Sequence, residues 1–513
     1  MDVEFSFDPC CEHLVVETSG GKVVGGRADG VLTWKGIPYG RAQRWRRPRP
    51  VSWEGEWDAT RYGPVAPQTT YTWKDQVIGD EECLNLDIVR PATSDRLPVV
   101  VYFHGGGYFA GASHTAVLRG YSFARELDVV YVGLNFRLGA LGYVDLTSVG
   151  SRGGFEELEP NPAMRDQILA LRWVRENIES FGGDPDRVCL MGESAGGAAI
   201  ASLMTVPSVK GLFHRAILQS APVMNVHSAR QSELWARRFV QYVGFRPRTV
   251  QVSDLLKVPT GEVVRAGQHM LWQGRGMWEL NACFGNSIDG DVLPEHPIDC
   301  FGAGAQAAVP LLIGTNSDEL SVAHMLFLTR RARAATARKM LEAYDPEGAD
   351  QVLAAYGGAG SRREFSELLT DAVFWSQSVR LAELHSQLSG VGTWMYRFDY
   401  APAALRRLGI GAMHSMELAA LFGDARASKA RLLLGAELDQ VTHLMQAAWR
   451  NFIWDSDPGW AEYRTPDRVT RIFERELRTV RDPRSEFREA WSNFHMHGWN
   501  GLESAVSLPR PGR

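Results

Sequence analysis

The chain has 513 residues, with 55 Lys and Arg against 60 Asp and Glu and a formal net charge of −5. This balance gives no basic surface of the kind that nucleic-acid binding requires, so no nucleic-acid partner is expected. The sequence contains no apolar run of about 18 residues, so neither a transmembrane helix nor stable membrane insertion is expected.

The N-terminal residues 1–8 read MDVEFSFD and are acidic. They lack the basic and apolar segments of a secretory signal. The six cysteines fit a reducing compartment, and we expect a cytoplasmic protein. The sequence leaves open whether Cys283 and Cys300 form a disulfide, and free thiols are expected.

A strand is predicted at 97–103, LPVVVYF, because β-branched and aromatic residues dominate it. His104 and three glycines follow, and consecutive glycines can turn bare N–H groups toward a ligand. A strand followed by HGGG supplies oxyanion-hole donors in esterases, so the amides of Gly106 and Gly107 are candidates. A phosphate loop is the alternative, but GGGYFAG at 105–111 lacks both the G-x-G-x-x-G spacing and a following Lys-Ser/Thr.

The sequence MGESAG at 191–196 follows an apolar run and precedes a stretch of small residues. That pattern predicts a strand, a very tight turn and a helix, which is the nucleophile elbow of the G-x-S-x-G motif. Ser194 is therefore the candidate nucleophile, and the amide of Ala195 is a third oxyanion donor. The alternative is a glycine-rich packing turn.

Four further blocks stand in a fixed order: WKGIPYG at 34–40, EECLNLD at 81–87, NFRLG at 135–139 and FGGDP at 181–185. With the elbow and the glycine run, they resemble the type-B carboxylesterase and cholinesterase family, which includes bacterial para-nitrobenzyl-type esterases. The resemblance covers nearly the whole chain. It implies a carboxylic ester hydrolase.

The resemblance also implies the two other members of a catalytic triad. The sequence GTNSDE at 314–319 is similar to the family's G-x-N-x-D-E-G, which makes Glu319 the triad acid. Leu320 stands where a glycine is usual, so the local backbone is expected to differ. HSME at 414–417 is similar to the family's H-x-x-E, which makes His414 the base. Glu193 matches an acidic position of the family, and either tunes His414 or is a carboxylate favoured at a helix N-terminus.

The implied fold is α/β, an α/β-hydrolase with a doubly wound, mostly parallel sheet. Residues 1–513 are expected to form a single domain, with inserted helices at roughly 320–410 roofing the active-site gorge. The implied mechanism passes through an acyl-enzyme on Ser194 and requires no cofactor and no metal. The partner is a small-molecule ester, and nothing in the sequence indicates the oligomeric state.

Two other functions remain open from the residues. One is a hydrolase with the same triad that acts on amides, carbamates or lactones. The other is a catalytically silent binding protein, because the family includes adhesion members. The silent members are expected to lack the nucleophile or the base, whereas this chain keeps Ser194, Glu319 and His414.

Smaller features complete the sequence prediction. Cys83 matches a cysteine that is disulfide-bonded in secreted relatives, but Ala66 occupies the partner position, so a free thiol is expected. Aromatic residues at 71–73 and 270–278 either line the substrate pocket or belong to the core. His495 and His497 have no accompanying ligands in the sequence, so a metal site there is not expected.

Overall fold

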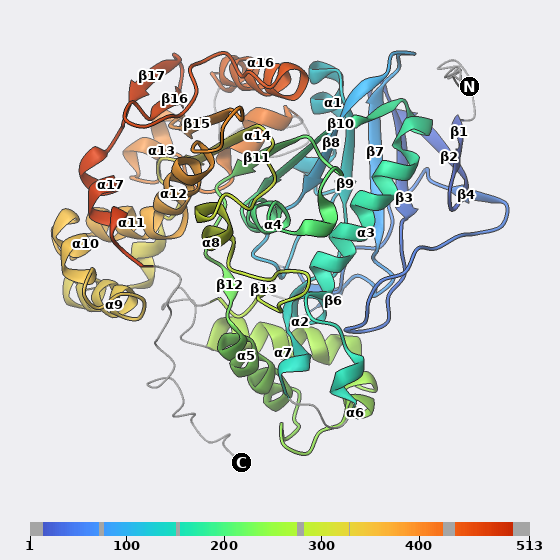
Figure 1. Ribbon diagram of the computed structural model, residues 1–513, viewed down its shortest axis with the longest axis horizontal. Coiled ribbons are helices and arrows are strands. Elements are labelled where there is room, and N and C mark those ends of the chain that lie inside the picture. The colour runs from blue at the N-terminus through green and yellow to red at the C-terminus, as the bar shows by residue number, and fades with distance from the viewer. Residues whose placement is uncertain are drawn as a thin grey trace.

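The computed structural model describes residues 14–70, 76–149, 154–273, 282–327, 329–423 and 437–495. Within these residues 13 strands form one large sheet (Figure 1). In spatial order its strands are β1 (Leu14–Thr18), β2 (Gly21–Ala28), β3 (Val31–Pro38), β7 (Asn85–Pro91), β9 (Val130–Leu134), β8 (Leu97–Phe103), β10 (Gly183–Glu193), β11 (Arg215–Gln219), β14 (Leu311–Asn316), β15 (Thr393–Phe398), β16 (Val469–Phe473) and β17 (Arg478–Arg481), with β4 (Glu56–Asp58) beside β2.

The centre of the sheet, from β9 to β16, is parallel, and the strands toward both edges are antiparallel. After β8 the chain adds β9 on one side and β10 on the other, so the winding direction changes at β8. In open α/β sheets, ligands bind at the carboxyl ends of the strands beside such a switch point. The glycine run follows β8 and the elbow follows β10, so both lie at this position.

Strand β8 shows why helices cover both faces of the sheet. Side chains of a strand point alternately to opposite faces. Val99, Val101 and Phe103 belong to one hydrophobic core, whereas Val100 and Tyr102 belong to another. All five are fully buried, as expected for a parallel strand covered on both sides. The predicted doubly wound α/β fold is confirmed.

Helices contribute residues to both hydrophobic cores. The first core includes residues of α3 (Pro162–Asn177), α4 (Ala195–Leu203) and α12 (Ser376–His385). The second core includes residues of α1 (Tyr121–Leu127), α14 (Met416–Phe422) and α16 (Leu438–Asp455). The remaining helices are α2 (Gly139–Tyr143), α5 (Ala229–Tyr242), α6 (Val252–Leu256), α7 (Thr260–Gln273), α8 (Pro297–Gly302), α9 (Arg330–Glu342), α10 (Ala349–Ala355), α11 (Arg362–Thr370), α13 (Ala403–Arg407) and α17 (Ser485–Ser492).

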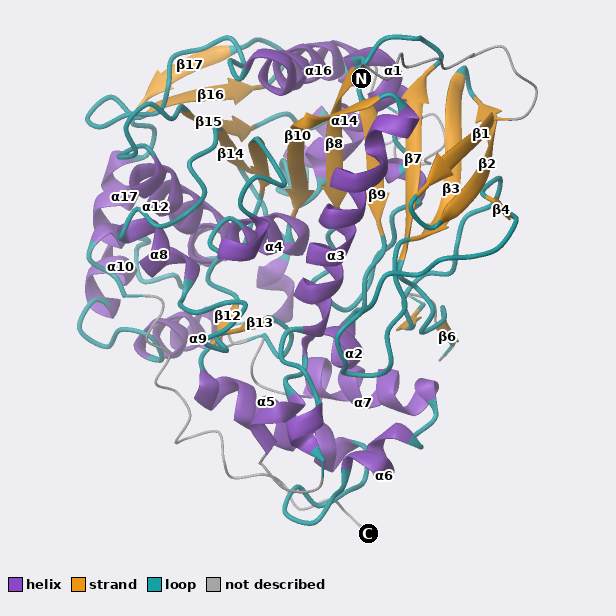
Figure 2. Ribbon diagram, turned by 45° about the vertical axis from the view of Figure 1, so that its right-hand side comes forward, coloured by secondary structure: helices purple, strands orange, loops and turns teal. Residues whose placement is uncertain are grey.

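Helices α5, α6 and α7 gather at the lower end of the molecule in Figure 2, below the sheet. The sequence pattern did not indicate this group. Two short ladders lie outside the large sheet: β5 (Gln68–Thr69) pairs with β6 (Val77–Ile78), and β12 (Val226–His227) pairs with β13 (Asn286–Ser287).

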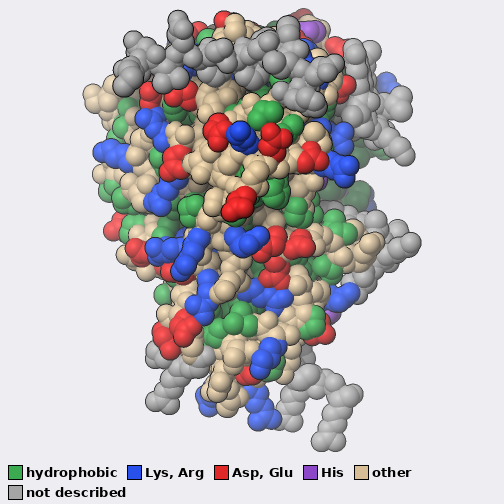
Figure 3. Space-filling view, turned by 90° about the vertical axis from the view of Figure 1, so that its right-hand side faces the viewer, with side chains coloured by type: hydrophobic (Ala, Val, Ile, Leu, Met, Phe, Trp, Pro, Cys, Tyr) green, Lys and Arg blue, Asp and Glu red, His purple; other side chains and the backbone are tan. Residues whose placement is uncertain are grey.

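Acidic and basic side chains are mixed on the face drawn in Figure 3. Three of the arginines between residues 44 and 47 pair with glutamates: Arg44 with Glu81, Arg46 with Glu157 and Arg47 with Glu159. Within the described part of the chain, no helix is both long enough and apolar enough to cross a membrane.

Candidate active site

The turn at Ser194 is strained and tightly packed. Ser194 has φ 56° and ψ −125°, between the last residue of β10 and the first of α4. Its N–H donates to the carbonyl of Gln219 on β11, at 2.9 Å. A Cβ added at Gly196 would lie 1.9 Å from the Phe103 carbonyl oxygen, so only glycine lets α4 pass this close to β8. The strain persists because the surroundings fix it, and such strained residues cluster at active sites.

Ser194, His414 and Glu319 form a continuous chain of hydrogen bonds. Ser194 Oγ lies 2.9 Å from His414 Nε2, and His414 Nδ1 lies 2.6 Å from Glu319 Oε2. Ser194 lies at the elbow, Glu319 lies in the loop after β14, and His414 lies in the segment before α14. The fold thus brings together three residues that are far apart in the sequence. Serine, imidazole and carboxylate in this order can activate a hydroxyl for nucleophilic attack.

Backbone contacts hold the acid and the base in register. The Asn316 N–H donates to Glu319 Oε1 at 2.7 Å, which orients the carboxylate. Asp318 Oδ2 accepts the Ala412 N–H at 3.1 Å and so holds the loop that carries His414. Leu320 packs against the first core and donates its N–H to Thr370 Oγ1. Its φ is not positive, so this turn does not require a glycine there.

The glycine run lies opposite the elbow. Gly106 has φ 111° and Gly107 has φ 61°, and a Cβ on Gly106 would lie 2.0 Å from the Ala110 carbonyl oxygen. A Cβ on Gly105 would lie 3.1 Å from Ser194 Cβ, which shows how near the run passes to the serine. Within the described residues, the N–H groups of Gly106, Gly107 and Ala195 have no protein acceptor. They are therefore available to a ligand oxygen.

Two further buried glutamates surround the histidine. Glu193 Oε1 lies 3.3 Å from His414 Nε2 and accepts a hydrogen bond from Ser415 Oγ at 2.6 Å. Glu417 accepts from Asn316 Nδ2 at 2.6 Å. Burial alone would lower the pKa of His414, but the carboxylates of Glu193 and Glu319 outweigh it and raise the pKa above the ordinary value of 6.5.

The same buried environment disfavours charge on the glutamates themselves. Burial raises the pKa of Glu193, against the opposing influence of His414 and Ser415. Burial, Glu193 and Glu319 together raise the pKa of Glu417 to about 8. Perturbed pKa values of this kind cluster at functional sites.

Phe374 is a further residue of the site, and it lies within the helical segment at 320–410 that the sequence predicts to cover the gorge. Its ring centroid lies 4.6 Å from that of His414, with 30° between the planes. It belongs to a π-helical turn (Asp371–Trp375) between α11 and α12. No motif marks this turn in the sequence. Glu417, by contrast, stands in the same H-x-x-E segment as His414, and that spacing could have identified it.

The remaining sequence candidates divide between core, surface and undescribed segments. Met270 and Leu271 lie on α7 and are buried in the first core. Residues 71–73 and 274–278 lie outside the described residues. His495 contacts Asp345, and His497 lies outside the described residues. In the described ranges, no group of three or more His, Cys, Asp or Glu could hold a metal ion.

The chain is similar to known proteins over most of its length. The model of the carboxylesterase family matches residues 12–475. The para-nitrobenzyl esterase of Bacillus subtilis (strain 168) is 34% identical over 511 residues, covering 93% of this chain and 98% of that protein. The phenmedipham hydrolase of Pseudarthrobacter oxydans is 28% identical, covering 88% of this chain and 93% of that protein.

The fold is similar to those of solved esterase structures. A PNB esterase superposes with a TM-score of 0.81 at 32% identity, covering 93% of this chain and 99% of that one. A Geobacillus stearothermophilus carboxylesterase superposes with a TM-score of 0.81 at 29% identity, with the same two coverages.

Proposed function

Because the chain belongs to the carboxylesterase family and is a carboxylic ester hydrolase, we propose that Ser194, His414 and Glu319 are its catalytic triad. The observation that carries the proposal is the chain of hydrogen bonds from Ser194 Oγ through the imidazole to Glu319. The 2.9 Å between Ser194 Oγ and His414 Nε2 is short enough for transfer of the hydroxyl proton, and the 2.6 Å between His414 Nδ1 and Glu319 is short enough to orient the imidazole, which supports these roles.

In this proposal Ser194 Oγ attacks the ester carbonyl while His414 Nε2 accepts the hydroxyl proton. The tetrahedral oxyanion binds to the N–H groups of Gly106, Gly107 and Ala195. His414 then gives its proton to the leaving alcohol, and water repeats the sequence on the acyl-enzyme. Glu319 keeps the imidazole oriented and stabilises the imidazolium.

Three variants test the roles. Ser194→Ala should abolish turnover, and Glu319→Gln should lower kcat by orders of magnitude while the protein stays folded. Asp318→Asn is the matched control, since Asp318 holds the loop but does not contact His414. If Asp318→Asn proved crippling and Glu319→Gln mild, the acid would be misassigned by one residue.

A substrate panel tests the type of bond that is cleaved. We propose that small carboxylic esters are the preferred substrates, and the relative named phenmedipham hydrolase makes carbamates the second class to compare. Hydrolysis of a chromogenic ester that exceeds that of matched anilides and carbamates supports this preference. Preferential cleavage of anilides or carbamates contradicts it, and absence of all turnover indicates a silent binding protein.

We also infer a single catalytic unit that works in a reducing compartment such as the cytoplasm. One sheet draws its strands from Leu14 to Arg481, which supports the single unit. Phe374 contacts His414 from within the helical segment at 320–410, which supports a covering role for that segment. Cys83, Cys189, Cys283 and Cys300 are all buried free thiols, the usual state in a reducing compartment.

A further inference from the structure

Helices α11 and α12 form one continuous helical segment, and this segment contains a single, wider π-helical turn next to the active site. Over Asp371–Trp375 the helix is π-helical, and single π turns occur frequently at functional sites. Two side chains that follow the turn bond to its carbonyls. Ser376 Oγ donates to the Asp371 oxygen at 2.8 Å, and Gln377 Nε2 donates to the Ala372 oxygen at 2.7 Å.

This turn places Phe374 against the catalytic histidine. The Phe374 side chain is buried, and its ring lies 4.6 Å from the imidazole, centroid to centroid. A ring packed at this distance limits rotation of His414. The orientation of His414 thus depends on the shape of the π turn as well as on Glu319.

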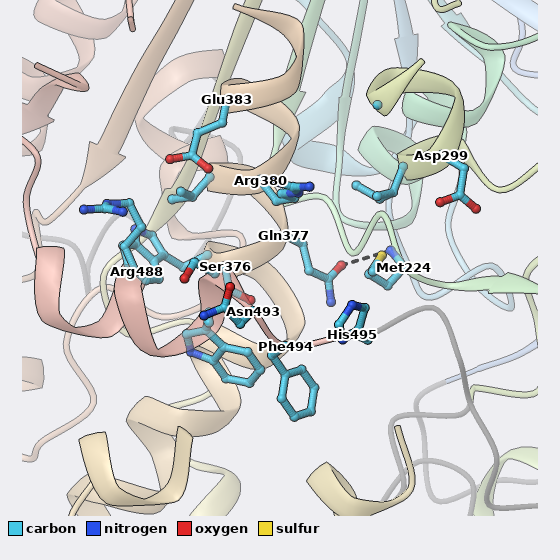
Figure 4. A pocket seen from close by; sticks show the side chains of 16 residues that line it. Met224, Asp299, Ser376, Gln377, Arg380, Glu383, Arg488, Asn493, Phe494 and His495 are labelled. Atoms are coloured by element: carbon cyan, nitrogen blue, oxygen red, sulfur yellow. Dashed lines mark hydrogen bonds between the residues drawn. The ribbon is translucent and has the colours of Figure 1, made fainter. Parts of the chain in front are cut away.

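The carboxamide of Gln377 also bonds to the nucleophile side of the site. Its Oε1 accepts the Met224 N–H at 3.0 Å, the contact drawn as a dashed line in Figure 4. Met224 lies in the loop that follows β11, and the last residue of β11, Gln219, accepts the Ser194 N–H at 2.9 Å. Gln377 therefore joins the turn that packs on His414 to the loop that begins beside Ser194.

We propose that Gln377 is a positioning residue of the esterase, which fixes Phe374 and Met224 relative to each other on the two sides of the Ser194–His414 pair. The proposal rests on the proposed function, since it takes these two residues as nucleophile and base. By setting this spacing, Gln377 controls the alignment of His414 with Ser194.

Only a side chain with both an acceptor and a donor can make this bridge. The Met224 N–H needs an acceptor and the Ala372 carbonyl needs a donor, and a carboxamide supplies both. A glutamate would keep the acceptor but, when ionised, would face the Ala372 carbonyl with negative charge. Gln377 is itself buried, so each of the two bonds is made away from solvent.

The π turn is not closely packed on all sides. A cavity of about 290 Å³ lies next to it, with Trp375, Gln377, Trp491 and Phe494 in its wall (Figure 4). The beginning of the turn has a separate anchor, because Asp371 pairs with Arg484 at 2.6 Å. Loss of the Gln377 bonds should therefore loosen the turn without unfolding the helix.

The test compares Gln377→Met, which keeps length and removes both bonds, with the parent enzyme on p-nitrophenyl acetate, butyrate and octanoate. Rates are divided by the number of sites titrated with an organophosphate, so that unfolded protein does not count. We expect kcat per site to fall about 10- to 100-fold, as small misplacements of catalytic groups do. We expect the fall to be similar for all three esters, because the cause is the alignment of His414.

A double-mutant cycle separates positioning from general damage. If Gln377 acts through Phe374, the double variant Gln377→Met/Phe374→Leu should lose little more than the worse single variant. Gln306→Met is the control, because Gln306 contacts His385 at the other end of α12. Unchanged kcat in Gln377→Met, fully additive losses, or an equal loss of kcat in Gln306→Met would overturn the proposal. Failure of the parent enzyme to be labelled at Ser194 would instead overturn the proposed function.

Discussion

The charges nearest His414 determine how the proposed base responds to pH. His414 must be neutral to accept the Ser194 proton, so kcat/KM falls as pH falls through its pKa. Glu193 and Glu319 raise that pKa, and Glu193 Oε1 is only 3.3 Å from the nitrogen that faces the serine. The acid limb of the pH profile should therefore lie above pH 6.5.

Glu193→Gln should move this acid limb to lower pH. Removing a negative neighbour disfavours the imidazolium, which lowers the pKa of His414 and extends activity toward acid. The measurement is kcat/KM against pH for both proteins, with Glu157→Gln as control, because the Glu157 side chain is 61% exposed. A limb that stayed in place, or moved to higher pH, would contradict a tuning role and leave Glu193 with a structural one.

Gly106→Ala should disrupt the proposed oxyanion hole. The new Cβ would lie 2.0 Å from the Ala110 carbonyl oxygen at φ 111°, so the loop must shift and its N–H groups must turn. Loss of one such donor costs about 10²–10³ in kcat. Gly30→Ala is the matched control, because Gly30 has φ 78° but nothing within 4 Å of an added Cβ. Equal kcat for the two variants would argue against the hole.

Residues that belong to a local motif could be predicted, and residues brought in by packing could not. Ser194, Gly106, Gly107 and Ala195 stand in short patterns whose backbone demands are visible in the sequence. Phe374 reaches His414 through a π turn, whose wider spacing depends on tertiary contacts that no sequence window contains.

At the scale of elements, the loop after β9 depends on a buried ion pair. Arg137 and Asp166 have side chains 4% and 0% exposed and lie 2.6 Å apart. Arg137→Met should lower the free energy of unfolding by about 3–5 kcal/mol, because it leaves Asp166 buried without a counter-charge. Urea denaturation measures this.

Arg175→Met is the matched control for that prediction. Arg175 pairs with Asp186 at the same 2.6 Å, but the two side chains are 42% and 69% exposed. An exposed pair contributes about 0–1 kcal/mol. If both variants lost the same stability, burial would not be the reason for the effect.

Element boundaries show where local pattern was sufficient. The predicted strand 97–103 coincides with β8, whose apolar residues fit a strand buried on both faces. Strand β14 runs from Leu311 to Asn316 and so takes in the first three residues of the GTNSDE block, which the sequence marked only as a motif. Pro310 has no N–H to donate to a ladder, and Gly314 to Asn316 pair with β15, a partner that lies far along the chain. Pro310 therefore limits the beginning of β14, and pairing with the distant β15 extends its end.

For the whole molecule, the burial of Ser194 should limit substrate size. Each buried methylene contributes about 0.8 kcal/mol until the pocket is full, after which steric exclusion dominates. We therefore expect kcat/KM along a p-nitrophenyl series to be greatest at short to medium acyl chains, without a jump above the solubility limit. A maximum at palmitate, or activation at an oil–water interface, would indicate a lipase.

The buried thiols predict that the folded enzyme does not depend on disulfides. Burial raises the pKa of the Cys83 thiol, which keeps it protonated and unreactive in the native state. Cys83 should react with thiol reagents only after unfolding, and reductant should leave kcat unchanged. A mapped disulfide that contains Cys83 would contradict the free thiol and the reducing compartment.

We expect Ser194 to be the nucleophile of this carboxylesterase, and peptide mapping after organophosphate treatment identifies the reactive serine. Only a serine beside a base and an oxyanion hole is expected to react, so mass spectrometry should find one adduct, on the peptide that contains Ser194. The Ser194→Ala protein should carry none. An adduct at another serine, or labelling that survives Ser194→Ala, would show that Ser194 is not the nucleophile.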